Sequence, residues 1–124
     1  MIIHIYLNES ERTLELMGLR ALSSVDAEAA SVCVHGVDPA DDVSGLTLTL
    51  YRSDRRDVAV TSWDGWTRVD GHPSSIRSSA PVGFSSDAVA EWMEDAGRGD
   101  TEAWAVLGSP ERLYAACAVP FVIA

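Results

Sequence analysis

One segment limits the fold of this 124-residue chain more than any other: residues 46–51 read Leu-Thr-Leu-Thr-Leu-Tyr. Apolar and polar residues alternate strictly, which is the side-chain period of a β-strand with one buried face. The pattern predicts that Leu46, Leu48 and Leu50 face a core, while the threonines and Tyr51 point the other way. Such a strand is stable only in a sheet, so the rest of the chain must supply its neighbours.

Other short apolar runs have strand character, and turn signals separate them. The Asp64-Gly65 dipeptide predicts a tight turn, and therefore a hairpin between residues 58–63 and 66–69. Residues 70–81 are rich in glycine, proline and serine and are expected to form a loop. The remaining predicted strands are residues 2–7, 13–17, 30–37, 102–107 and 113–119.

The first thirty residues allow two interpretations. Residues 2–7 and 13–17 flank a polar stretch and predict a hairpin with a five-residue loop. A helix that begins near Ser10 is the alternative. Both interpretations leave the chain mainly β.

One short helix is expected late in the chain, between Ser86 and Ala96. Ser86 is a suitable N-cap, and Gly97 is a suitable terminator. The apolar residues between them recur at helical spacing and form one stripe: Val89, Trp92, Met93 and Ala96. Residues 1–124 are thus expected to form a single domain, an antiparallel β-sandwich with this helix inserted.

Charge excludes two classes of partner. Nine basic residues, all arginine, face nineteen acidic ones, for a net charge of −10. An acidic surface repels phosphate backbones and anionic lipids, so we expect neither nucleic acid nor membrane as a partner. The apolar N-terminal run is short and lacks the basic start of a signal peptide, which predicts synthesis in a cytoplasm.

No metal or cofactor site is expected. His4, His35 and His72 do not lie at ligand spacing from one another, and none is taken to have a cysteine nearby. Asp38, Asp41 and Asp42 do not follow the spacing of a calcium loop. Cys33 and Cys117 lie in apolar segments and are expected to be free, reduced and buried, with a disulfide as the alternative.

No catalytic motif is visible either. The chain has no nucleophile elbow, phosphate-binding loop or zinc-protease motif, so we expect a protein that is not an enzyme. A small hydrolase whose carboxylates meet only in the folded chain is one alternative. Trp63 and Trp66, on either side of Asp64-Gly65, could bind a sugar or a partner, although large aromatics more often pack in the core. Pro120 lacks an N–H and predicts an edge strand or a bulge, which makes it the third candidate contact residue.

The order of elements resembles an immunoglobulin-like β-sandwich found in bacteriophage and prophage tail, baseplate and tail-fibre proteins. Three parts carry the resemblance. They are residues 46–51 with a charged turn and 58–60, the serine-capped segment 86–93, and the hairpin of 104–107 with 113–115 that closes on 119–123.

The resemblance implies a structural virion component that contacts other structural proteins, and homo-oligomers fit such repeated appendages. It assigns no functional residues. A carbohydrate- or ligand-binding sandwich that uses Trp63 and Trp66 is the alternative function.

Overall fold

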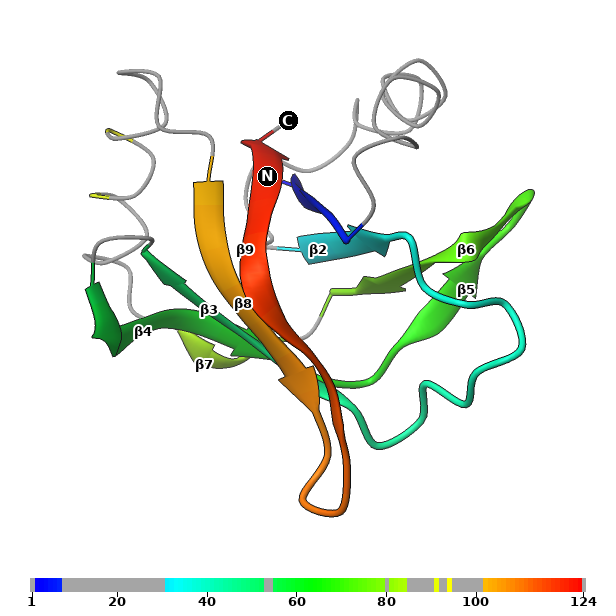
Figure 1. Cartoon of the computed structure of the whole chain (residues 1–124). Coiled ribbons are helices and arrows are strands. Elements are labelled where there is room, and N and C mark those ends of the chain that lie inside the picture. The colour runs from blue at the N-terminus through cyan, green and yellow to red at the C-terminus, as the bar shows by residue number, and fades with distance from the viewer. Residues whose placement is uncertain are drawn as a thin grey trace.

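The computed structural model describes residues 2–7, 31–52, 55–79, 81–84, 91, 94 and 102–123. These residues form a mainly β structure, as predicted. The strands are β1 (Ile2–Tyr6), β2 (Ser31–His35), β3 (Thr47–Arg52), β4 (Arg55–Trp63), β5 (Thr67–Val69), β6 (His72–Ser78), β7 (Pro81–Phe84), β8 (Glu102–Gly108) and β9 (Leu113–Ile123). All nine belong to one sheet in the order β5-β6-β2-β1-β9-β8-β3-β4-β7 (Figure 1).

The sheet has two halves that share β9. Residues Leu113–Pro120 of this long strand pair with β8, and Phe121–Ile123 pair with β1. Pro120 is therefore the last residue paired with β8, at the point where β9 changes partner. The strand lies inside the sheet, and its ladder with β8 is irregular between Leu107 and Gly108 and not at Pro120, so the prediction that Pro120 marks an edge strand or a bulge is wrong.

The core lies between the two halves. One contiguous apolar cluster takes Ile3, Ile5, Val32, Val34 and Ile76 from the first half and Leu48, Leu50, Val60, Trp63, Ala103, Ala105 and Leu107 from the second. Because side chains alternate along a strand, the residues between these core residues point to the other face of the sheet, away from the cluster. The alternation predicted for residues 46–51 is confirmed, since its three leucines are buried and its threonines are half-buried.

The N-terminal strand has neighbours on both sides. β1 pairs in parallel with β2, and on its other side pairs antiparallel with β9. Both sides of β1 are therefore occupied along the described residues, and residues 13–17, the second strand of the predicted hairpin, lie outside them. A parallel pair requires a long crossover, and residues 8–30, which lie outside the described residues, separate β1 from β2.

Two further strand predictions are corrected. β5 pairs with β6, while β4 pairs with β3 and β7, so Asp64-Gly65 links the two halves and does not close a hairpin. The tight turn is at Asp70-Gly71, where Gly71 has a φ of 77°. Residues 70–81, predicted as a loop, contain all of β6. Its serines and proline weaken the strand signal, but pairing with both β2 and β5 overrides local propensity.

The predicted helix between Ser86 and Ala96 lies outside the described residues, apart from Glu91 and Glu94. It stays a prediction. Glu91 accepts an ion-paired hydrogen bond from Arg52 of β3 at 3.1 Å.

Candidate functional site

A cluster of polar side chains lies on the face of β1 and β2 opposite the core. Ile3 and Ile5 of β1 belong to the core cluster, so His4 and Tyr6 point to the other face. The parallel register places His4 beside Cys33 and Tyr6 beside His35. All four side chains are at most 3% exposed, so this second face is buried as deeply as the core.

Strand β6 extends the same two rows. Cys33 pairs with Arg77, and His35 pairs with Ser75. One row across the three strands therefore reads His4, Cys33, Arg77, and the next reads Tyr6, His35, Ser75.

The two histidines share a hydrogen bond. His4 Nδ1 and His35 Nε2 are 3.1 Å apart, and His35 Nδ1 is 2.8 Å from Ser75 Oγ. A neutral imidazole has one N–H donor and one acceptor nitrogen. The chain of contacts is satisfied when His4 Nδ1–H donates to His35 Nε2 and His35 Nδ1–H donates to Ser75, or when both bonds run in reverse.

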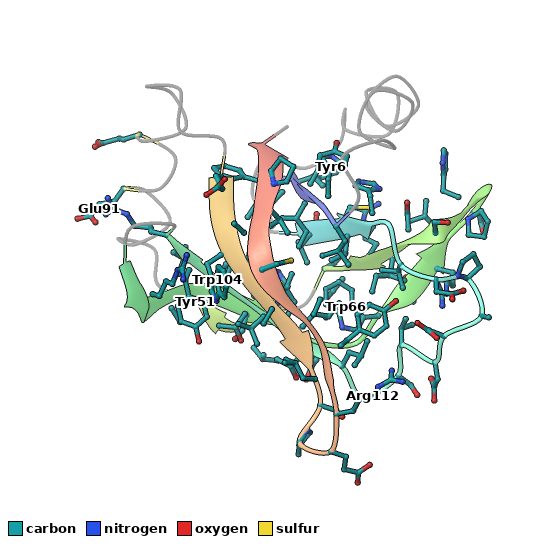
Figure 2. The ribbon with its side chains drawn as sticks, viewed as in Figure 1. Tyr6, Tyr51, Trp66, Glu91, Trp104 and Arg112 are labelled. Atoms are coloured by element: carbon teal, nitrogen blue, oxygen red, sulfur yellow. The ribbon has the colours of Figure 1, made fainter. Side chains whose placement is uncertain are left out.

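Ring stacking fixes the orientation of His35. The Tyr6 ring lies 4.8 Å from the His35 ring at an interplanar angle of 21°, and the His4 ring lies 5.4 Å away at 17°. Figure 2 shows Tyr6 at the end of β1, beside β2. Rotation of His35 is thus blocked by two rings and two hydrogen bonds.

Burial keeps both imidazoles neutral. Desolvation, with the Arg77 charge as a smaller cause, lowers the pKa of His4 from 6.5 to about 4. Desolvation also lowers the pKa of His35 to about 3, with smaller contributions from His4 and His72. At neutral pH each ring consequently offers a nitrogen lone pair without competition from a second proton.

These side chains bring three potential metal ligands together. One ligand atom from each of His4, Cys33 and His35 lies within 4.8 Å of the other two. The sequence-based statement that no histidine has a cysteine nearby is wrong, because Cys33 is two residues from His35 on one face of a strand. The spacing of Cys33 and His35 could be recognised from the sequence. The approach of His4 could not, because it depends on the parallel pairing of β1 with β2.

The tryptophans differ in their burial. Trp63 is fully buried in the core, as the commoner behaviour of large aromatics suggests, and cannot present its ring to a partner. Trp66 is half-buried against the core, and its Nε1 donates to the Leu46 carbonyl at 2.9 Å (Figure 2). Pro120 is half-buried inside the sheet.

The remaining candidates do not assemble a site. Cys33 and Cys117 are both free thiols, as predicted, although Cys117 is only half-buried. Asp42 accepts from the Ser44 amide and hydroxyl, which lowers its pKa in an exposed turn. Asp38 accepts from the Ala40 amide. These aspartates form no group of three ligands within the described part of the chain.

Comparisons with known proteins add no assignment: no family model, no curated protein and no solved structure matches the chain. Over the described residues, no helix combines the length and apolarity needed to span a bilayer.

Proposed function

We propose that the chain is a non-catalytic assembly module of a bacteriophage or prophage tail, baseplate or fibre, where it contacts other structural proteins. One observation carries this proposal. β7 is the last strand in the sheet order, and no described strand pairs with its outer side. Val82 in this strand is 58% exposed. An open strand edge with an apolar side chain is a surface to which a second protein can add a strand.

The order of elements supports the virion setting. Two of the three parts that carry the resemblance fall within described residues, apart from residues 53–54 of the charged turn. β3 pairs with β4, β8 pairs with β9, and β3 and β8 are neighbours. The third part, residues 86–93, lies outside the described residues apart from Glu91. The Ig-like sandwich belongs to the same proposal, with the two halves of the bent sheet acting as the two layers.

The burial of the candidate residues favours this function over its alternatives. An enzyme that uses His4, Cys33 or His35 is disfavoured, since each is at most 3% exposed and a dissolved substrate does not reach them. The pair of tryptophans cannot both bind a sugar, because Trp63 is buried in the core. The assembly reading requires neither an open catalytic cleft nor an exposed aromatic platform.

The test is whether the chain occurs in particles. Particles induced from the source strain should contain the chain by mass spectrometry, and its gene should lie beside tail or tape-measure genes. Absence from purified particles, together with a metabolic operon, would contradict the proposal.

The edge is tested by two matched substitutions. Val82→Lys places a charge on β7, and such charges block strand addition. Thr67→Lys places the same charge on β5, the strand at the opposite end of the sheet, whose Thr67 is also exposed. We expect Val82→Lys to reduce incorporation into particles at least tenfold and Thr67→Lys to leave it unchanged. Equal incorporation of both variants would exclude β7 as the contact.

A further inference from the structure

We infer that His4, Cys33 and His35 form a binding site for a thiophilic transition-metal ion, held by two imidazole nitrogens and one thiolate. The site is independent of the assembly function proposed above. Its three ligands come from two strands that are brought together by the parallel pairing of β1 and β2.

The distances fit a metal centre. Two nitrogens on one tetrahedral Zn²⁺, with bonds of about 2.0–2.1 Å, lie about 3.3 Å apart, and a thiolate sulphur lies about 3.6 Å from each. His4 Nδ1 and His35 Nε2 are already 3.1 Å apart. The distance between any two ligand atoms is at most 4.8 Å. The thiolate sulphur therefore needs to approach a nitrogen by about 1.2 Å at most to reach the distance that zinc requires. Rotation of the Cys33 side chain about its Cα–Cβ bond supplies such a change without moving the strands, while the His35 ring stays in its stack.

The surroundings supply what a metal-bound histidine needs. When His35 Nε2 binds an ion, its proton must lie on Nδ1, and Ser75 Oγ is placed 2.8 Å from that nitrogen to accept it. A hydrogen bond of this kind fixes the tautomer and the ring orientation of metal-bound histidines. Tyr6 stacks on the same ring and holds its plane. The His35 ring is therefore oriented before any ion arrives.

Charge favours a monovalent ion. Cys33 has Arg77 as its register partner on β6, and the guanidinium charge also acts on His4. Zn²⁺ with one thiolate leaves a net charge of +1 beside Arg77, whereas Cu⁺ with one thiolate leaves none. Burying an uncompensated charge is costly. Thiolate ligands select both ions, and two imidazoles with one thiolate are a known copper ligand set, so we expect Cu⁺ to bind more tightly than Zn²⁺.

Metal binding requires loss of one proton from the Cys33 thiol. The two histidines are already neutral, so one ion binds and one proton leaves per site. Because the ligands are buried, the ion enters during folding or through a local opening of the sheet. Refolding in the presence of the ion is therefore the appropriate way to load the site.

The experiment uses the full chain without a histidine tag. It is unfolded, refolded in EDTA, in excess Zn²⁺, or in excess Cu⁺ under anaerobic reducing conditions, then dialysed and analysed for metal by mass spectrometry. We expect about one equivalent of bound ion. At a free ion concentration 100-fold above the dissociation constant, the melting temperature should rise by about 10 °C. Refolding in Co²⁺ should give a thiolate-to-cobalt charge-transfer band.

Matched variants separate a metal site from a buried hydrogen-bonded cluster. Cys33→Ser and His4→Gln should lose the bound ion, the cobalt band and the metal-dependent rise in melting temperature. Cys117→Ser and His72→Gln alter the other cysteine and the remaining histidine, and should keep all three.

The outcomes decide the inference without relying on stability alone. Circular dichroism in EDTA reports whether each variant folds, and Cys33→Ala provides a second, apolar replacement if the serine variant does not. The inference would be overturned if the folded parent chain bound less than a fifth of an equivalent of Zn²⁺ and also less than a fifth of an equivalent of Cu⁺. So would equal metal content in the parent and in folded Cys33→Ser or Cys33→Ala. Stoichiometric Zn²⁺ without Cu⁺ would keep the site and overturn the charge argument.

Discussion

Acidifying the metal-free chain from about pH 7 to about pH 5 should destabilise it by about 4 kcal/mol, because two buried histidines stay neutral in the folded state. The folded pKa values are lowered to about 4 for His4 and about 3 for His35, against 6.5 in an unfolded chain. As the pH falls below about 6.5, the unfolded chain therefore binds protons that the folded chain does not. Stability is present above this pH and is lost progressively down to the folded pKa values.

The size of the effect follows from the unfolded state. At about pH 5 each unfolded histidine is almost fully protonated, which favours the unfolded chain by about 2 kcal/mol per histidine. The figure holds for any folded pKa well below 5. The charged and titratable groups acting on the pair are Arg77, which acts on His4, and His72, which acts on His35. Both lower the pKa, so they reinforce the effect of burial.

Urea unfolding in EDTA, followed by circular dichroism, measures the effect. With a urea dependence of about 2 kcal/mol per M, the midpoint should fall by about 2 M between the two pH values. His35→Gln should retain about half of this shift, since one buried histidine remains. Cys33→Ser changes the same cluster without removing a histidine and should retain all of it. A midpoint that is independent of pH, or a full shift in His35→Gln, would refute the reasoning.

Three further results test the packing and the backbone. Leu48→Ala, at a fully buried position, should cost about 2–5 kcal/mol by urea unfolding, whereas Leu113→Ala, at a position 65% exposed, should cost less than about 1 kcal/mol; similar costs would show that the core is misplaced. Gly71→Ala should cost about 1–2 kcal/mol because φ there is +77°; the added Cβ meets no atom, so the cost comes from the backbone conformation alone. Gly71→Asn should recover part of that loss, since asparagine tolerates a positive φ better than alanine does. In the native chain a thiol reagent should label Cys117 before Cys33, which is 2% exposed and should react only on unfolding; prompt labelling of both would contradict the described burial.

The sequence predicted which face of a strand is buried better than it predicted which strands are neighbours in the sheet. Alternation in residues 46–51 identified which side chains are buried, because side-chain direction is a local property of a strand. Which strand lies beside which depends on long-range packing that alternation does not encode. The Asp64-Gly65 signal is a case: Gly65 has the positive φ typical of a turn glycine, 70°, but the strands on either side belong to different halves of the sheet.

The candidate metal site shows the same division. Cys33 and His35 share a face by their two-residue spacing, and a closer reading of the sequence identifies that pair. His4 joins them only because β1 and β2 run in parallel with a register that places His4 beside Cys33. Along Ile2–Tyr6, His4 and Tyr6 alternate with Ile3 and Ile5 and so mark one face of the strand, but the sequence does not show which strand lies beside it.

The position of β1 between β2 and β9 has a consequence for the order of folding. Ile3 pairs with Ile123, so the first strand meets one of its neighbours only after about 120 further residues have been synthesised. Contacts this distant in sequence slow folding, because the intervening chain must be ordered before they form. During synthesis, the apolar residues of β1 lack their β9 neighbour until residues 121–123 leave the ribosome. Nascent chains that lack residues 121–123 should therefore be sensitive to protease and prone to aggregate, and release of those residues should complete the sheet.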